Sequence, residues 1–428
     1  MSTSRSTYRS LFADPSFPLF IILTASFFLT VFFRISASVI LPLEGERLGM
    51  SASLVGFISS VHFYAYALMQ PVSGILHDRY GPVRVVTCGL LLTAASCLLL
   101  TVVRTPFTLG VWRLVSGFGV SPMYSATLVF LAFAFPAERY CFYAGINFAV
   151  SSLGAIVSVA PLGFALDTFG IPVTFALLAG TCFFMALFLG RRATSDPMRR
   201  AAGDEKKTLS SILPGIGRAV LFIFRNRRVR SLMIVWAVSS ASLLSFQGLW
   251  GVSWFAAAFN ASPASARFWS SLISAGMMVG PLMIGGVVLS PEKLPLLVRR
   301  VSSVNALVWF LLLGTTVSGL PVWAGGAVAL LLGAITGLRG VFALAGVTAL
   351  APAGEKGVVF GAMNMIAVLS AVVFQWGTGI VINRFPAGQP GVYTAEGYFA
   401  AFLLVSCAMA ASLIALRSLG KEPLKREE

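Results

Sequence analysis

The sequence predicts an all-α polytopic membrane protein with twelve transmembrane helices in two pseudo-symmetric bundles of six. Of its 428 residues, 57% are hydrophobic and only 11% are charged, and the mean hydropathy is +0.88. Soluble domains carry about 25% charged residues. The chain divides into apolar runs of about 20 residues, which is the length of helix that crosses a bilayer. The alternating segments of about ten residues that are typical of a transmembrane barrel are absent.

The apolar runs place the spans in chain order. The predicted spans are residues 18–42, 54–76, 85–103, 107–134, 141–166, 173–189, 232–258, 267–288, 300–318, 322–350, 357–382 and 398–416. The one long hydrophilic stretch, 191–231, separates an N-terminal bundle (18–190) from a C-terminal bundle (232–416). Polar segments flank them at 1–17 and 417–428. Within the central loop, an apolar stretch at 212–224 precedes a basic run, which predicts a short helix lying at the membrane interface.

The distribution of basic residues predicts the orientation. An even number of spans puts both termini on one side, and a cytoplasmic N-terminus places most of the 31 Lys and Arg residues in cytoplasmic segments. Arg47, Arg104, Arg267 and Arg384 then fall outside. The net charge of +16 is therefore interpreted as topology and contact with anionic lipid headgroups, not as nucleic-acid binding. We expect a multi-pass protein of the plasma (inner) membrane with both termini cytoplasmic.

Several other classes of function lack their sequence signals. The five cysteines lie in or beside apolar runs without metal-ligand spacing, and there are two histidines. No metal or cofactor is expected, and the cysteines are interpreted as packing residues. No phosphate-binding loop, H-E-x-x-H motif or pair of aspartates within spans is present. We expect neither an enzyme nor an ATP-driven pump.

A weak internal repeat supports two related halves. Glu138 and Asn147, at the start of the fifth span, recur with the same separation as Glu355 and Asn364 at the start of the eleventh. These are the fifth spans of their respective halves. Parallel repeats of this kind occur in transporters that bind substrate at the midplane between the halves.

The stretch between spans two and three, G-I-L-H-D-R-Y-G-P-V-R, runs from residue 74 to residue 84. Gly74 and Gly81 allow a tight turn and the close approach of a neighbouring helix. The Asp78 carboxylate suits a helix N-terminus or nearby arginines such as Arg79 and Arg84. We expect these five residues to form a latch that stabilises one conformation. The alternative is a solvated turn whose charge pair contributes little.

This stretch resembles the loop signature of the major facilitator superfamily, G-x-L-a-D-r-x-G-r-k/r. Five positions match and Arg84 follows, whereas His77 and Pro82 depart from it. The superfamily's R-x-x-x-G-x-G in span four is matched by Arg113, Gly117 and Gly119. The resemblance implies a twelve-helix transporter that works by alternating access, monomeric by default.

Two further comparisons with subgroups concern the substrate. The span-five motif of drug–proton antiporters, G-x-x-x-G-P-x-x-G, has only a partial counterpart in Gly154 and in Ala160-Pro161-Leu162-Gly163. An arginine deep in span one, with more in later spans, is similar to the organophosphate–phosphate and oxalate–formate exchangers. The resemblance therefore favours anions over cationic drugs.

Three arginines lie within predicted spans: Arg34 near the middle of span one, Arg113 in the outer part of span four, and Arg339 in span ten. Charged residues in spans usually face a cavity and serve function. No Asp or Glu lies at depth to neutralise them, and an arginine retains its proton. A bound anion, held between Arg34 and Arg339, is the economical partner. The alternative, that backbone carbonyls or water hold these arginines, stays open, above all for Arg113.

Other polar residues complete the predicted substrate site. The candidates around the anion are Tyr66, Gln247, Trp250, Asn364 and Gln375. His62 is the one side chain in the predicted spans whose ordinary pKa lies near neutral pH, so we expect it either to carry a coupling proton or simply to hydrogen-bond within its bundle.

We therefore expect a secondary transporter of a small organic or phosphorylated anion. It works by anion exchange or by proton-coupled symport, and its partners are the solute, a co- or counter-transported proton or anion, and membrane lipids. The alternatives are a proton-driven exporter of drugs or amphiphiles and, from another class, a membrane receptor or enzyme.

Overall fold

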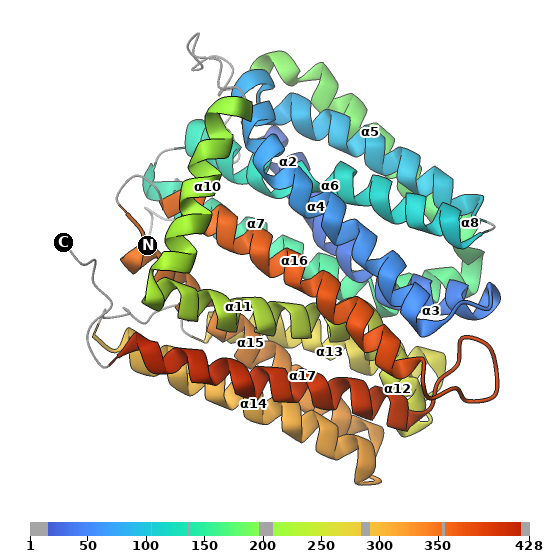
Figure 1. The fold of residues 1–428 in the computed structure, drawn as a ribbon. Helices are drawn as coiled ribbons and strands as arrows, with labels where there is room; N and C mark the ends of the chain where they lie inside the picture. The colour runs from blue at the N-terminus through green and yellow to red at the C-terminus, as the bar shows by residue number, and fades with distance from the viewer. Residues whose placement is uncertain are drawn as a thin grey trace, which may run out of the picture.

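The computed structural model describes residues 16–103, 105–135, 137–196, 209–283, 292–352 and 356–420. The predicted polar N-terminus up to residue 15, part of the central loop (197–208), the end of span eight, Glu355 of the repeat and the end of the tail (421–428) lie outside these residues. Within them the fold is helical, with one isolated β-bridge between Pro386 and Tyr393. Figure 1 shows the helices lying alongside one another in two groups.

The helices follow the predicted spans closely. The N-terminal half contains α2 (Phe17–Ile35), α3 (Ala37–Arg47), α4 (Ala52–Tyr80), α5 (Pro82–Thr101), α6 (Pro106–Ala134), α7 (Ala137–Val157) and α8 (Ala160–Arg191). The C-terminal half contains α11 (Arg227–Ser245), the π-helical turn η2 (Phe246–Trp250), α12 (Gly251–Phe259), α13 (Pro263–Leu282), α14 (Leu294–Val317), α15 (Val322–Leu350), α16 (Lys356–Ile382) and α17 (Ala395–Ala415). Between the halves lies α10 (Leu209–Arg225), close to the predicted interfacial helix.

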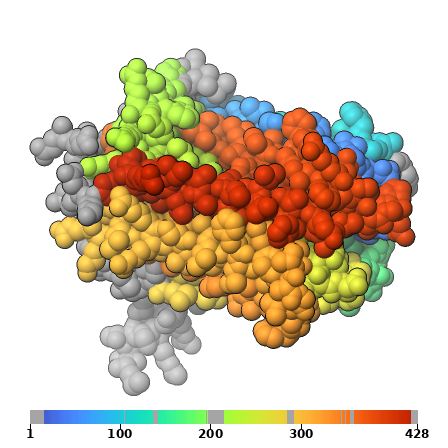
Figure 2. Space-filling view, turned by 60° about the horizontal axis from the view of Figure 1, so that its bottom comes forward, coloured from blue at the N-terminus to red at the C-terminus, as the bar shows by residue number. Residues whose placement is uncertain are grey.

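Ten of the described helices are long and apolar enough to cross a membrane. The two other predicted spans are α7, which the first part of α8 continues, and α13. Spans three, six, nine and twelve carry no charge in their interiors and expose large apolar side chains. Figure 2 shows α14 and α17 side by side on one such face, where Leu307 and Leu404 are 66% and 58% exposed.

Span five is not one continuous helix. The helix α7 ends at Val157, and α8 begins at Ala160 with Pro161 in its first turn. Pro161 has no N–H to donate to the Val157 carbonyl, so the helix restarts there. Gly170, with φ 74°, then separates spans five and six within α8. This positive φ strongly favours glycine.

Glycines let the helices of the N-terminal half approach closely. A Cβ added to Gly117 of α6 would lie 2.6 Å from the His62 carbonyl oxygen of α4, and one added to Gly89 of α5 would lie 2.6 Å from the Gly119 oxygen. Any side chain at Gly117 or Gly89 would push the helices apart. Both α4 and α5 therefore pack firmly on α6.

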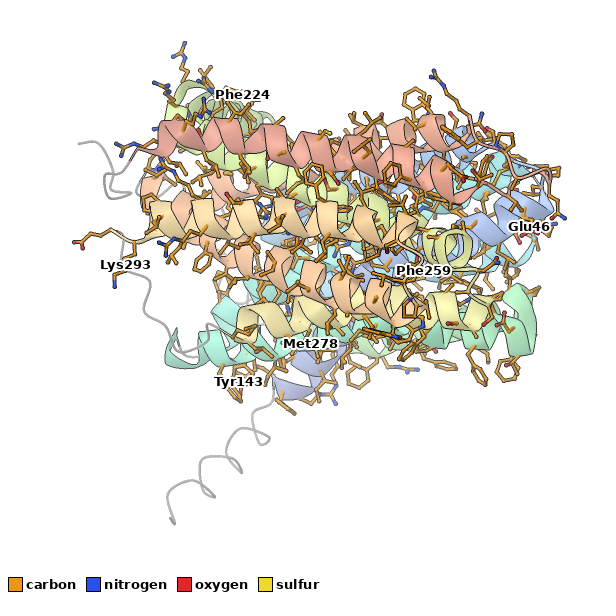
Figure 3. All side chains as sticks on the ribbon, turned by 90° about the horizontal axis from the view of Figure 1, so that it is seen from below. Glu46, Tyr143, Phe224, Phe259, Met278 and Lys293 are labelled. Atoms are coloured by element: carbon orange, nitrogen blue, oxygen red, sulfur yellow. The ribbon has the colours of Figure 1, made fainter. Side chains whose placement is uncertain are left out.

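The bundle has two distinguishable ends. Figure 3 places Lys293 and Phe224 at one of them, which carries α10, and Glu46 at the other, which carries α3. We call these the α10 end and the α3 end. The first helix of each half, α2 and α11, begins at the α10 end. The two halves therefore have the same orientation.

Contacts between the halves gather toward the α3 end. The Ala52 N–H donates to the Tyr393 hydroxyl (2.6 Å), and Arg267 of α13 forms a two-pronged ion pair with Asp167 of α8, with one N–O distance of 3.0 Å. A Cβ added to Gly56 would lie 2.4 Å from the Gln375 carbonyl oxygen, and one added to Gly379 would lie 2.5 Å from that of Ala52. The halves thus meet backbone to backbone at this end.

Candidate functional site

A cavity of about 280 Å³ lies between the two halves. The N-terminal half lines it from α2, α4, α6 and α7, and the C-terminal half lines it from η2, α13 and α16. The lining residues are Phe27, Thr30, Val31, Arg34, Tyr66, Tyr124, Phe148, Ser151, Ser152, Ala155, Gln247, Ser274, Met277, Asn364 and Val368. Four of the predicted substrate residues are therefore brought together: Arg34, Tyr66, Gln247 and Asn364.

Arg34 is the one charged residue among these lining residues. Its Nε is buried and has no hydrogen-bond partner. Across the residues that the structure describes, its guanidinium makes no hydrogen bond or ion pair. An arginine cannot discharge itself by losing a proton, so this side chain requires an anionic partner from elsewhere or water.

Aromatic rings form one wall of the cavity. The Phe27 centroid lies 4.9 Å from that of Tyr124 and 6.0 Å from that of Phe148. Tyr124 and Phe148 are 6.1 Å apart. Together these three rings offer an apolar surface for the body of a small solute, with the Tyr124 hydroxyl as a polar edge.

The C-terminal half contributes uncharged polar groups. Gln247 Nε2 donates to the Ser274 hydroxyl at 2.8 Å, which fixes the amide at the cavity wall. Asn364 enters from α16. The cavity thus pairs one cation from the N-terminal half with neutral hydrogen-bonding groups from the C-terminal half.

Arg113 is buried outside the cavity. Its two terminal nitrogens donate to the carbonyl oxygens of Phe33 (3.0 Å) and Ser59 (3.1 Å), and its guanidinium lies 5.4 Å from the Trp112 ring centroid. These contacts tie α6 to α2 and α4. The structure therefore places Arg113 outside the lining of the cavity, with both of its terminal nitrogens bound to backbone carbonyls.

Arg339 does not reach the cavity either. Its side chain is 3% exposed and donates to the Val235 carbonyl at 3.2 Å, joining α15 to α11. The predicted two-arginine clamp is absent from this conformation. A position near the middle of a span shows depth, but not the direction in which the side chain points.

Trp250 and Gln375 also lie outside the cavity. The Trp250 indole donates to the Thr378 hydroxyl (3.0 Å), and Gln375 Nε2 donates to the Leu244 carbonyl (2.9 Å). In an α-helix, Gln247 and Trp250 would share a face. The π-helical turn adds a residue here, so that Gln247 faces the cavity while Trp250 packs toward α16. Such turns often occur at functional sites.

His62 lies one turn from Tyr66 and is fully buried. Its Nδ1 is 3.2 Å from the Ser116 hydroxyl, its Nε2 has no partner, and its ring stacks at 6.4 Å on Tyr66. His62 therefore contacts the cavity indirectly, through Tyr66.

The second histidine differs from the prediction. The helix α4 continues to Tyr80, so His77 is not in a loop but is buried at 1% exposure, with Nε2 3.0 Å from the Ser125 hydroxyl. His62 is thus not alone as a buried histidine in a span. Gly81 sets the end of this helix, because its φ of 81° stops it there.

The predicted latch residues surround this turn. Pro82 opens α5 directly after Gly81, and the Val83 N–H donates to the Asp196 carboxylate at 3.1 Å. The Asp196 carboxylate thus sits at the α5 N-terminus. The Arg79 guanidinium lies over the Tyr80 ring. Among the described residues, no atom of a neighbouring helix lies within 4 Å of a Cβ added to Gly74.

Sequence reasoning missed several cavity residues, namely Phe27, Tyr124, Phe148, Ser151, Ser152, Ser274 and Met277. A signal existed for Ser151, which lies one helical turn beyond Asn147. That asparagine is fully buried, with both amide atoms unpartnered. The aromatic residues gave no such signal, because a ring in a span looks the same whether it faces lipid, core or cavity.

Two helical bundles with a cavity between them are the arrangement found in secondary transporters. A profile of the Major Facilitator Superfamily matches residues 23–375, and the chain belongs to that family. The twelve-helix fold and the recognition from sequence are thereby confirmed.

Individual proteins agree with this assignment. A bacterial homologue of the human lysosomal transporter Spinster, 13% identical, superposes with a TM-score of 0.72 over 94% of this chain and 96% of the other. A probable sulfoacetate transporter of Cupriavidus necator is 26% identical over 132 residues, which is 31% of each chain. The probable anion transporter 2, chloroplastic, of Oryza sativa subsp. japonica is 23% identical over 86% of this chain and 71% of the relative.

Proposed function

We propose that this protein is a secondary active transporter of a small organic anion, which binds in the central cavity against Arg34. The observation that carries this proposal is the Arg34 guanidinium, which lines the cavity with its Nε buried and, among the described residues, has no hydrogen bond or ion pair; the cavity lining has no carboxylate. Arginine binds carboxylate, sulfonate or phosphate oxygens through paired hydrogen bonds. The names of relatives, a probable sulfoacetate transporter and a probable anion transporter, support the same class.

The size of the cavity limits the substrate. The cavity volume of about 280 Å³ is close to the lower limit of the range of ligand pockets. A compact anion fits, with its charged group on Arg34, its body on the aromatic wall, and its far end near Gln247 and Asn364. The phosphorylated solutes considered from the sequence fit this proposal only if they are similarly small.

Transport proceeds by alternating access, in which the halves 18–190 and 232–416 rock about the cavity. We place the α10 end in the cytoplasm, because the basic segments lie there, with α10 at the interface and the protein in the plasma (inner) membrane as a monomer. The contacts at the α3 end then close the outer side. The turn at Gly81 and its charges act as the cytoplasmic latch.

The coupling is either anion exchange or proton symport. The absence of a carboxylate from the cavity lining supports exchange. His62, stacked on Tyr66, is the group through which symport would operate. An exporter of drugs or amphiphiles is the alternative; it is supported by the aromatic wall and opposed by the lone arginine.

The test is thermal stabilisation of the purified protein by a panel of small carboxylates, sulfonates, phosphates, sugars and organic cations. Wild type is compared with Arg34→Ala and with Arg339→Ala as the matched control. Stabilisation by one anion class, lost in Arg34→Ala and kept in Arg339→Ala, supports the proposal. Stabilisation by cationic amphiphiles alone, unchanged in either variant, would overturn it. Uptake into vesicles with a pH gradient or with internal anion then separates symport from exchange.

A further inference from the structure

A second hollow, of about 400 Å³, lies on the N-terminal half away from the cavity between the halves. It runs between α4 and α5, and α6 forms its floor. Leu76 and Met69 come from α4, Cys88 and Leu92 from α5, and Phe118 from α6. Leu92 is 40% exposed and Cys88 is also exposed, so the groove opens on the outside of the bundle.

The groove follows from how these three helices pack. The tight turn at Gly81 joins α4 to α5, but each of them packs extensively on α6 and much less on the other. Gly117 and Gly89 set those close contacts with α6. The space between α4 and α5 is therefore left unfilled along its length, with Phe118 and Pro122 beneath it.

The length of the groove matches one leaflet of a bilayer. It runs from Tyr80 to Met69 along α4 and from Arg84 to Leu92 along α5. At 1.5 Å per residue these stretches are about 16 Å and about 12 Å. The hydrocarbon core is about 30 Å thick, so the groove reaches from the membrane surface at the α10 end to about the midplane.

The charge lies at the surface end of the groove. Arg84 is a lining residue, and Tyr80, 42% exposed, stands beside it at the level where aromatic side chains favour the interface. Across the described residues, the Arg84 guanidinium forms no hydrogen bond or ion pair. The deeper part of the groove is apolar throughout.

We propose that this groove binds an anionic phospholipid of the leaflet at the α10 end. One acyl chain lies between α4 and α5 over Phe118, and the lipid phosphate pairs with Arg84. The groove is apolar over the length of one leaflet and has a cation at its surface end. This combination fits a phospholipid better than a free anion, because a free anion has no acyl chain to bury. A bound lipid would also cover the α4–α5 turn that carries the family signature.

The test is native mass spectrometry of the full chain, titrated with phosphatidylglycerol or phosphatidylcholine of identical acyl chains. Cys88→Trp fills the groove, and Cys407→Trp, at an exposed cysteine of α17, is its matched control. Arg84→Gln removes the cation, and Arg191→Gln, at the exposed end of α8, is its control. Arg84→Lys retains the charge.

In wild type we expect phosphatidylglycerol to bind about tenfold more tightly than phosphatidylcholine. Arg84→Gln should abolish that preference, and Arg84→Lys should keep it. Cys88→Trp should remove one bound lipid of either kind, while both controls behave as wild type. The proposal is overturned if Arg84→Gln keeps the preference, or if Cys88→Trp binds as many lipids as Cys407→Trp.

Discussion

In the N-terminal half, Arg34 lines the cavity and makes no hydrogen bond with the described residues, whereas in the C-terminal half Arg339 lies outside the lining and donates to the Val235 carbonyl. The C-terminal half instead lines the cavity with Gln247, Ser274 and Asn364, which are all uncharged. The two halves are related in fold but not in chemistry. In the function that we propose, the N-terminal half supplies the attraction for an anion, and the C-terminal half distinguishes one anion from another.

The substitution Arg34→Ala is the strongest test of this difference between the halves. Two charge-assisted hydrogen bonds to a bound anion contribute together about 4 kcal/mol, so we expect transport to fall by about 1000-fold. Thermal stability should stay equal or rise, because an unpaired buried charge is removed. Counterflow of a labelled anion in proteoliposomes measures the first effect, and unfolding in detergent measures the second. Transport within a few-fold of wild type would contradict the assignment.

Arg113→Ala should act on stability rather than on anion affinity. It removes the two hydrogen bonds from a charged donor to the Phe33 and Ser59 carbonyls, which tie α6 to α2 and α4, at a cost of about 3 kcal/mol. We expect a lower unfolding temperature and a lower yield of monodisperse protein. Any folded fraction should bind the anion with wild-type affinity. A stable variant with lost affinity would return Arg113 to the substrate site.

Arg339→Ala tests the other side of the comparison. One hydrogen bond to the Val235 carbonyl is lost, with an expected destabilisation of about 1.5 kcal/mol. Anion affinity, measured by the ligand-induced shift in unfolding temperature, should remain within about threefold of wild type. A loss as large as that in Arg34→Ala would instead show that Arg339 swings into the cavity during the transport cycle.

Gln247→Ala and Asn364→Ala should have the smallest effects on the favoured anion. Each removes a neutral hydrogen bond of about 1 kcal/mol, so KM should rise by about fivefold. Selectivity among anions should change more than KM. Gln247 and Asn364 lie across the cavity from Arg34, so they contact the part of the solute that differs from one anion to another. Competition among anions of one charge but different bodies measures this. Ser302→Ala, in α14 and outside the lining residues, provides a control.

The sequence predicts the class, the two halves and Arg34, because a span without acids leaves few interpretations of a deep arginine. It cannot separate Arg34 from Arg113 or Arg339, which gave the same signal. What differs is which neighbouring helix lies beside each guanidinium, and this depends on helix rotation and packing. In the same way, nothing in the residues around Gln247 predicts the π-helical turn that directs Trp250 away from the cavity.

The end of α4 shows a smaller limit. The prediction ended span two at residue 76, because His77 and Asp78 are polar, yet the helix extends to Tyr80 and buries His77. Hydropathy locates the membrane, whereas a backbone signal, the positive φ of Gly81, ends the helix. Hydropathy thus sets the end of the apolar stretch at residue 76, and the backbone at Gly81 sets the end of the helix at Tyr80, one helical turn later.

The backbone contacts at Gly56 and Gly379 have a consequence for the working cycle. In the closed state, a methyl group at either position would overlap a carbonyl oxygen of the opposite half, and the overlap would vanish once that end opens. Such a methyl group would destabilise only the state that is closed at the α3 end, because the steric overlap exists in that state alone. Each 1.4 kcal/mol of this destabilisation changes the ratio of the two states tenfold. In the cycle that we propose, glycine at these two positions therefore favours the state that is closed at the α3 end, without touching the substrate.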